Sequence, residues 1–254
     1  MRRFYVTPDN MVDGQVFIDG EEARHIATVL RSQPGDKISV FDGSEYEHEV
    51  KLLSVTSSMV IGQVLFSRLN TTEPPVVVTL VQGLAKGEKM DYIIQKSVEL
   101  GVNRIIPIQT DRSLVKLDRE RAFGRVKRWN RITVEACKQC GRSQPPVVDE
   151  VSCLGSILKG VSGTPSIFFY EQHKTNQLGT LINQHRQAML EQGVVVFIGP
   201  EGGFSQREAQ LAEKTGSLMA GLGPRTLRTE TAGLVALSIL MWELGDLGGY
   251  RLNL

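Results

Sequence analysis

Short runs in which apolar and polar residues alternate or cluster fill the chain from residue 1 to about residue 70. Alternation with a period of two is typical of β-strands, and turn-forming Gly, Asp and Asn residues separate the runs. Residues 21–30 differ, because apolar side chains such as Ile26 and Leu30 recur at helical spacing. The pattern predicts a small, mostly β domain with one helix and with strands at residues 15–18, 37–41, 45–55 and 59–67.

A polar, proline-rich segment at residues 70–75 interrupts this pattern and predicts a linker. We place a domain boundary there, with a first domain at residues 1–71 and a second at residues 72–254. In the second domain strand-like runs alternate with helical ones, which predicts a mainly parallel sheet with helices on both faces, an α/β fold. The predicted strands cover residues 76–84, 104–109, 166–170, 194–198 and 219–222, and the helices residues 90–100, 118–139, 178–190, 205–215 and 229–244.

Two glycine- and proline-rich stretches each follow a predicted strand and precede a predicted helix. They are residues 198–204 (IGPEGGF) and residues 222–232 (LGPRTLRTETA). Turns at the carboxyl edge of an α/β sheet bind ligands, and glycines let the backbone approach a ligand closely. Neither stretch matches a phosphate-binding loop or a dinucleotide fingerprint. A pair of ordinary turns is the alternative, but the ionisable residues in both stretches favour a polar, backbone-lined site.

The two predicted helices nearest these stretches carry further signals. Ser205 and Glu208 have the spacing of a capping box, which fixes a helix start directly after the first stretch. The last helix is apolar nearly all round between residues 232 and 244. Since one face can cover its own sheet, the other needs a second apolar surface. We therefore expect a homodimer whose interface includes part of residues 234–244.

The composition is that of an ordinary globular protein, with 41% apolar and 22% charged residues. No apolar run approaches the length of a membrane span, and residues 1–6 lack the apolar core of a signal peptide. Three cysteines argue against a disulfide framework, so we expect a cytoplasmic protein without a membrane partner. We expect no metal, because Cys137 and Cys140 lack a second ligand pair and the four histidines have no ligand spacing.

The formal net charge is only +1, but basic residues are concentrated in one segment. Residues 1–72 hold seven Lys and Arg against ten Asp and Glu, whereas residues 112–142 hold ten against three. Most of these bases form a helical stripe opposite an apolar face that includes Trp129. Such a stripe is either a solvated face or a contact surface for a polyanion, and the scarcity of acids favours RNA. The stripe consists of Arg121, Arg125, Arg128, Arg131, Lys138 and Arg142.

The two glycine- and proline-rich stretches, in this order and near the end of the chain, resemble the RsmE family of the SPOUT methyltransferase superfamily. That family methylates N3 of uridine 1498 in 16S ribosomal RNA with S-adenosylmethionine. The resemblance implies a PUA-like β-barrel in the first domain, a C-terminal trefoil knot in the second, and a homodimer. It extends over the whole chain, including residues 25–31 and 86–89, with one departure at Cys140, where the family usually has serine.

The resemblance also implies which residues bind the cofactor, with the backbone of both turns contacting adenine and ribose. The implied cofactor-binding residues are Tyr170, Glu171, Ile198, Gly199, Pro200, Glu201, Gly202, Gly203, Leu222, Gly223, Arg225, Leu227, Arg228 and Thr229. Charge and resemblance together indicate the RNA-binding residues. These are Arg2, Arg3, Arg24 and Arg31 in the first domain, and Lys86, Lys89, Arg121, Arg125, Arg128, Arg131 and Arg142 in the second.

Catalysis at uridine N3 needs help, because N3 carries a proton and is a poor nucleophile until that proton leaves. Arg228 is the candidate for stabilising negative charge on a uracil carbonyl oxygen. Glu201 and Glu230 are the candidates for accepting the proton. The alternatives are that Arg228 only pairs with a carboxylate of the pocket wall, and that Glu230 only compensates the helix dipole.

Two other functions stay open at this point. One is a non-enzymatic RNA-binding ribosome-assembly factor, and the other is a methyltransferase of the same fold that acts on another RNA site. Ionisable residues in both turns favour an enzyme, since a mere binding pocket has no need of them. Phosphate transfer is disfavoured, because the chain has neither a phosphate-binding loop nor a metal-binding pattern.

Overall fold

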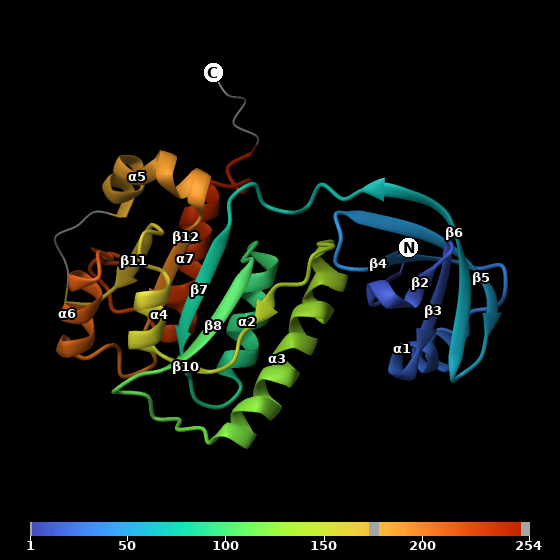
Figure 1. The fold of residues 1–254 in the computed structure, drawn as a ribbon, viewed down its shortest axis with the longest axis horizontal. Helices are drawn as coiled ribbons and strands as arrows, with labels where there is room; N and C mark the ends of the chain where they lie inside the picture. The colour runs from blue at the N-terminus through green and yellow to red at the C-terminus, as the bar shows by residue number, and fades with distance from the viewer. Residues whose placement is uncertain (1, 173–177, 250–254) are drawn as a thin grey trace. The chain divides into compact units, whose positions relative to one another are not determined.

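The protein is represented by a computed structural model that describes residues 2–172 and 178–249 (Figure 1). The chain forms two compact units. The first takes in the chain up to Glu73 together with Cys137–Pro145, and the second takes in the rest. Residues 137–145, which the sequence pattern assigned to the second domain, therefore group with the first unit.

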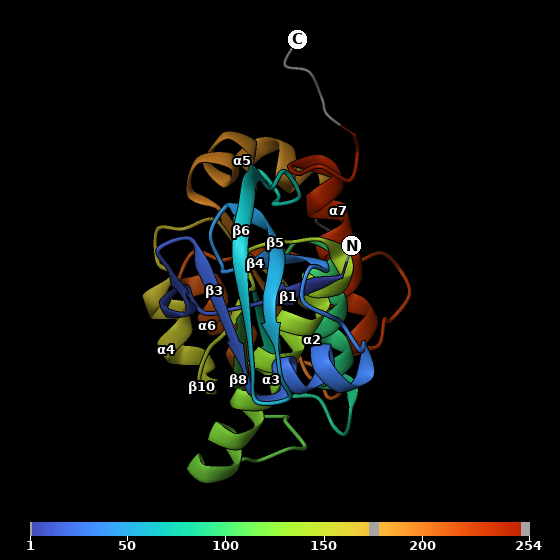
Figure 2. The same cartoon turned by 90° about the vertical axis from the view of Figure 1, so that its right-hand side faces the viewer.

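The first unit is built on a six-stranded mixed sheet, and Figure 2 shows how strongly this sheet curls. The strand order is β1-β4-β5-β6-β3-β2, with β1 and β4 parallel and the other neighbours antiparallel. Apolar side chains such as Val40 and Val50 pack with Ile26 into one core. The strands are β1 (Arg3–Tyr5), β2 (Met11–Val12), β3 (Gln15–Asp19), β4 (Lys37–Phe41), β5 (Tyr46–Val55) and β6 (Met59–Leu69), with a 3-10 turn η1 (Pro8–Asn10).

The helix predicted over residues 21–30 has a different form in the structure. A short α1 (Gly20–Arg24) continues as a π-helical turn, η2 (His25–Val29). The Thr28 hydroxyl donates to the Arg24 carbonyl oxygen at 2.6 Å, and the Leu30 amide donates to the His25 carbonyl oxygen, five residues back. The Thr28 hydroxyl bonds to the Arg24 carbonyl oxygen and so competes with the backbone amide that would bond there in a regular α-helix. The turn therefore widens.

The second unit contains, over the residues described, a seven-stranded sheet whose paired strands are all parallel. The order is β10-β8-β7-β12-β11-β13, with β9 beside β8. The strands are β7 (Val78–Gly83), β8 (Arg104–Gln109), β9 (Val147–Val148), β10 (Ser152–Cys153), β11 (Ser166–Phe169), β12 (Val194–Ile198) and β13 (Leu218–Ala220). The helices are α2 (Lys89–Glu99), α3 (Arg119–Cys140), α4 (Leu154–Gly160), α5 (Leu178–Gln192), α6 (Gln206–Lys214) and α7 (Thr229–Glu243).

Helices cover both faces of the parallel sheet, as the sequence predicts. Neighbouring residues of a strand point to opposite faces. Val81 and Phe197 therefore pack with α4 and α6, whereas Gln82 and Ile198 lie against α7, which also packs on α2. Since all strands are parallel, their carboxyl ends share one edge, where loops can build a site. The prediction missed β1, β2, β9, β10 and α4, which are two to seven residues long.

The last helix, α7, is apolar on more sides than its own sheet covers. It buries Ala236, Leu237 and Leu240, but Trp242 is 54% exposed and Leu234 is only half-buried. The homodimer and the knot stay predictions. No helix in the described ranges combines the length and the apolar character needed to cross a bilayer.

Candidate functional site

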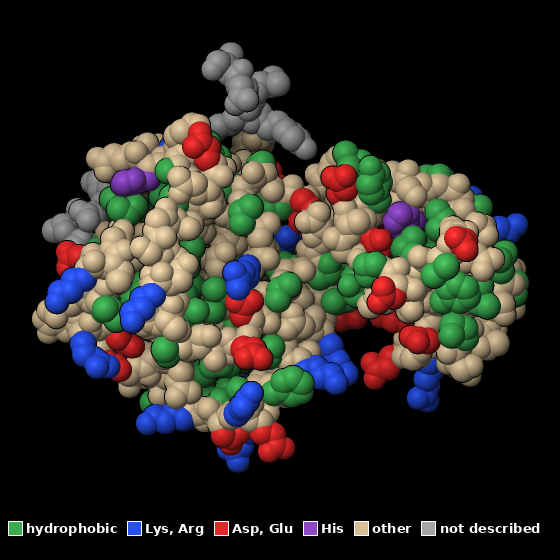
Figure 3. All heavy atoms as spheres, viewed as in Figure 1, with side chains coloured by type: hydrophobic (Ala, Val, Ile, Leu, Met, Phe, Trp, Pro, Cys, Tyr) green, Lys and Arg blue, Asp and Glu red, His purple; other side chains and the backbone are tan. Residues whose placement is uncertain are grey.

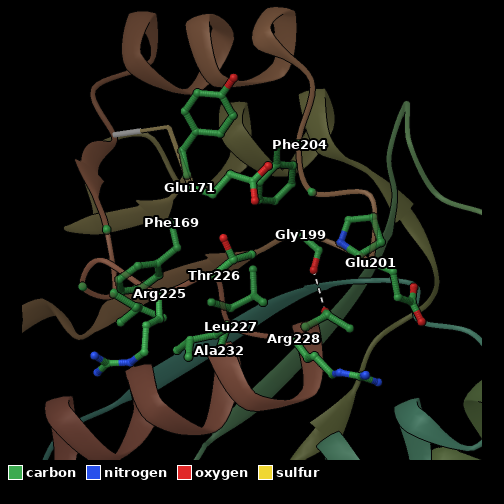
Figure 4. Close-up of a pocket in the computed structure, with 18 of the residues that line it drawn as sticks. Phe169, Glu171, Gly199, Glu201, Phe204, Arg225, Thr226, Leu227, Arg228 and Ala232 are labelled. Atoms are coloured by element: carbon green, nitrogen blue, oxygen red, sulfur yellow. Dashed lines mark hydrogen bonds between the residues drawn. The ribbon is translucent and has the colours of Figure 1, made fainter. Parts of the chain in front are cut away.

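A cavity of about 400 Å³ opens at the carboxyl edge of the parallel sheet, between the loops that follow β11, β12 and β13 (Figure 4). Aromatic rings, backbone groups and charged side chains share its wall. The lining residues are Lys89, Phe169, Tyr170, Glu171, Ile198, Gly199, Pro200, Glu201, Gly203, Phe204, Gly221, Leu222, Gly223, Pro224, Arg225, Thr226, Leu227, Arg228, Thr229 and Ala232.

The turn after β12 forms the first wall of the cavity. The backbone packs tightly at Gly199, because a Cβ there would lie 3.0 Å from the Gly203 carbonyl carbon. Gly203 has a φ of +65°, which glycine adopts readily. The Ser205 hydroxyl accepts from the Glu208 amide, and the Glu208 carboxylate accepts from the Ser205 amide. The predicted capping box is thus confirmed, and it fixes the start of α6 behind the turn.

A buried hydrogen-bond chain joins this turn to the end of β7 and to the start of α7. Gln82 Nε2 donates to the Thr229 hydroxyl at 2.9 Å, and this hydroxyl donates to the Gly199 carbonyl oxygen at 2.6 Å (Figure 4). Gly83 lets Pro200 pack closely, because a Cβ at residue 83 would lie 2.5 Å from it. These hydrogen bonds direct the Gly199 carbonyl toward Thr229. They therefore fix the positions of three separate segments relative to one another.

The loop between β13 and α7 forms the second wall. Arg228 is the N-cap residue of α7, and the Arg225 and Arg228 side chains leave the loop in opposite directions (Figure 4). Both are exposed, and among the described residues neither guanidinium forms an ion pair. The alternative in which Arg228 pairs with a carboxylate of the pocket wall is therefore not what the described structure shows.

An ion triad lies at the rim of the cavity. Lys89 Nζ is 3.3 Å from Glu201 Oε1 and 3.2 Å from Glu230 Oε2. The Lys86 amide donates to the same Glu201 oxygen at 3.0 Å. The loop that leads into α2 is thereby connected to both turns of the cavity.

The triad shifts the pKa values of Lys89 and Glu201. A hydrogen bond to Glu230, followed by one to Glu201, raises the pKa of Lys89 above its ordinary value. Burial acts to raise the pKa of Glu201, but the amides of Lys86 and Glu201 and the Lys89 ammonium outweigh it, so that this pKa is lowered. Both side chains therefore stay charged at neutral pH.

The cavity brings together the predicted cofactor-binding residues except Gly202. Gly202 packs outside it against Arg112, whose Cβ would be 3.0 Å from a Cβ at residue 202. Glu230 lies in a neighbouring groove with Tyr92. The prediction missed Gln82, although a polar residue inside the apolar run of β7 is the signal that points to it.

The predicted RNA-binding residues of α3 are in part paired with acids, so the expected lack of neutralising partners is wrong. Arg128 is 2.6 Å from Asp91, and Arg121 is 3.4 Å from Asp118. Lys and Arg side chains are interspersed with Asp and Glu near the start of α3, at the lower edge of Figure 3. The more C-terminal base Lys138 pairs with Glu22.

Arg142 and Arg3 are held inside the first unit. Arg142 is 3% exposed and lies 2.7 Å from Glu73, whose other oxygen accepts from the amides of Ser143 and Gln144. Arg3 pairs with Glu47 at 2.9 Å. Arg142 is therefore not available for RNA. The exposed members of the predicted set are Arg2, Arg24, Arg31, Lys86, Arg121, Arg128 and Arg131, and Arg125 is half-buried.

Within the described ranges, no three His, Cys, Asp or Glu side chains converge on a point where they could hold a metal ion. Cys137 is buried, and a hydrogen bond with Cys140 together with burial raises its pKa. Both features fit a packing role for this pair.

Comparison with known proteins gives matches over nearly the whole chain. Residues 72–241 match an RNA methyltransferase domain, and residues 18–64 match an RNA methyltransferase PUA domain. The chain is 32% identical to ribosomal RNA small subunit methyltransferase E of Bacillus subtilis, over 98% of this chain and 99% of the relative.

Two solved structures are similar in fold and in sequence. Ribosomal RNA small subunit methyltransferase E from Neisseria gonorrhoeae, bound to S-adenosyl methionine, has a TM-score of 0.87 and 34% identity, and covers 97% of this chain and 99% of its own. A putative methyltransferase from Legionella pneumophila, in complex with the same cofactor, has a TM-score of 0.84 and 30% identity, over 96% of this chain and 98% of its own. The predicted α/β fold with a PUA-like first domain is confirmed.

Proposed function

Because this chain belongs to the ribosomal RNA small subunit methyltransferase E family, we propose that it methylates N3 of uridine 1498 in 16S ribosomal RNA, with S-adenosylmethionine as methyl donor. The observation that carries the proposal is a glycine-lined cavity that includes Arg228, whose guanidinium forms no ion pair within the described ranges. A substrate in the small ribosomal subunit also means a cytoplasmic location.

The cavity fits S-adenosylmethionine, which when bound supplies a methyl group on a positively charged sulfur. The volume of about 400 Å³ lies within the range of small-molecule sites. Gly199 and Gly203 expose backbone that can bond to the adenine and the ribose, and Leu227 and Phe169 offer apolar contact. Glu171 adds a carboxylate that can accept from hydroxyl groups.

Arg228 is proposed to stabilise the reacting base. Loss of the N3 proton leaves negative charge on the uracil carbonyl oxygens, which strong donors stabilise. The exposed guanidinium of Arg228 has no carboxylate partner among the described residues, so it can donate to such an oxygen. Glu201 and Glu230 remained candidates for accepting the proton, but their ion pairs with Lys89 favour a positioning role instead.

The RNA is proposed to contact both domains. Residues 1–71 form the RNA-binding domain, whereas residues 72–254 bind the cofactor, catalyse the transfer and dimerise. The exposed bases Arg2, Arg24 and Arg31 serve the first domain, and the exposed Lys86 and Arg131 with the half-buried Arg125 serve the second. The uncovered apolar surface of α7, with Trp242 54% exposed, supports a homodimer.

Calorimetry and a methylation assay test this function. We expect saturable binding of S-adenosylmethionine near one cofactor per subunit, and methyl transfer to N3 of one uridine in small subunits that lack the modification. Saturable RNA binding without cofactor binding would mean a ribosome-assembly factor. Methylation of a different nucleotide would mean another RNA site.

A further inference from the structure

Three segments far apart in the chain meet at the rim of the cavity, and two joints connect them. They are the end of β7 with the loop to Lys89, the turn after β12, and the first residues of α7. The inner joint is the buried chain from Gln82 through Thr229 to the Gly199 carbonyl. The outer joint is Lys89, placed between Glu201 and Glu230 at 3.3 and 3.2 Å. Each joint touches all three segments.

The outer joint leaves little capacity for proton transfer. One oxygen of Glu201 already accepts from the Lys86 amide and faces the Lys89 ammonium. Glu230 Oε2 faces the same ammonium. A carboxylate that is stabilised in its ionised form by fixed donors is a weak base.

We propose that Lys89 is a positioning residue that holds Glu201 and Glu230, and with them the two turns, at a fixed separation, and that the N3 proton of the target base leaves to solvent. This inference rests on the proposed function. In balance, water or hydroxide takes the proton, the N3 anion forms the new bond to the methyl carbon, and the bond from that carbon to sulfur breaks.

The pH dependence follows from the directions of the two shifts. The Glu201 pKa lies below its ordinary value of 4.5, so its ionised form is lost only on acidification through that lowered pKa. The Lys89 pKa lies above 10.5, so its charge is lost only as pH rises through that raised value. The ion pair between Lys89 and Glu201 therefore keeps both charges across neutral pH. The other titratable and charged side chains facing the cavity and its groove are Tyr170, Glu171, Arg225, Arg228, Glu88 and Tyr92.

The first test measures binding of S-adenosylhomocysteine, which lacks the sulfonium charge, to Lys89→Met, Lys89→Arg and the control Lys96→Met by calorimetry. Lys96 lies on the same helix and pairs with Glu99, three residues along that helix. We expect Lys89→Met to bind about fivefold more weakly, because a solvent-exposed ion pair contributes little, and Lys89→Arg to recover most of this loss. Wild-type affinity for Lys89→Met would overturn the proposal.

A second readout separates positioning from general structure. Without Lys89, the two carboxylates lose the ammonium that both contact, and repulsion between like charges raises the pKa of one of them. We expect the affinity of Lys89→Met to change between about pH 5 and about pH 7, whereas wild-type affinity stays constant. An affinity of Lys89→Met that does not change with pH, or a wild-type affinity that does change in this range, would contradict the positioning role of Lys89.

The third test follows the single-turnover methylation rate against pH for the wild type and Glu201→Gln, and it does not depend on how Lys89 variants fold. If solvent takes the proton, both rates rise with pH through the neutral range with the same slope. A flat profile for the wild type, or a slope that differs between the wild type and Glu201→Gln, would make Glu201 the base and overturn the inference. Failure of the wild type to bind S-adenosylhomocysteine would instead contradict the proposed function.

Discussion

The rim of the cavity and the basic stripe that runs along α3 to Arg142 both concentrate charged side chains, but these side chains are paired differently in the two regions. At the rim, Lys89 is matched to two carboxylates, whereas Arg228 forms no ion pair with any residue that the structure describes. In the stripe, acids from elsewhere in the chain hold individual bases, such as Asp91 with Arg128. The difference teaches that pairing, rather than position in a stripe or motif, separates bases that maintain the structure from those that can meet a ligand.

The largest expected effect is on stability, at Arg142. Its pair with Glu73 is almost fully buried on the arginine side, and removing one partner leaves the other without compensation. We expect Arg142→Ala to lower the free energy of unfolding by about 3 kcal/mol in denaturant titration. Arg131→Ala, an exposed control, should change it by less than about 0.5 kcal/mol. Equal effects would erase the distinction between paired and unpaired arginines.

Next in size is the effect of Arg228→Ala on catalysis. We expect the methylation rate at saturating cofactor and RNA to fall about a hundredfold or more, the scale of losing one charge-stabilising donor. Folding and dimerisation should be unaffected, because Arg228 makes no ion pair among the described residues. Arg225→Ala, from the other side of the same loop, is the matched variant. A wild-type rate for Arg228→Ala would make Arg225 the residue to test next.

A smaller effect is expected at the inner joint of the cavity. Thr229→Val keeps the shape of the side chain but breaks the hydrogen bonds to Gln82 and to the Gly199 carbonyl. We expect cofactor affinity to fall about tenfold by calorimetry, since a buried group left unpaired costs about 1 to 3 kcal/mol. Thr229→Ser should restore the affinity. If Ser and Val behave alike, the hydrogen-bond chain does not shape the site.

The smallest effect concerns RNA. We expect the double variant Arg125→Ala and Arg131→Ala to weaken RNA binding and to reduce the salt slope by about 1 to 2, with cofactor affinity unchanged. The paired residues give the comparison, because Arg121→Ala with Arg128→Ala removes charges that Asp118 and Asp91 already offset. A larger loss of salt slope in the Arg121→Ala and Arg128→Ala double variant would contradict the claim that arginines paired with acids contribute less to RNA binding.

Local features of the site could be predicted from the sequence because each depends on neighbours in the chain. Gly199 and Gly203 are required by a single tight turn, and Ser205 and Glu208 cap a helix within four residues. Strands such as β12 are apolar throughout because both faces of a parallel sheet are buried.

Distant pairs could not be predicted, because no periodicity links them. Gln82 and Thr229 are 147 positions apart, and Arg142 and Glu73 are 69 apart. The same holds for Lys89, because the family pattern at residues 86–89 indicates RNA contact but does not reveal its two carboxylate partners. Charge patterns therefore locate candidate surfaces, but the three-dimensional partners decide what each base does.

The central claim is tested most directly by mass spectrometry of 16S ribosomal RNA from cells that lack this protein. The account predicts that N3-methyluridine is lost at position 1498 alone, and that the wild-type chain restores it whereas Arg228→Ala does not. Unchanged methylation at that position in the absence of the protein would contradict the account.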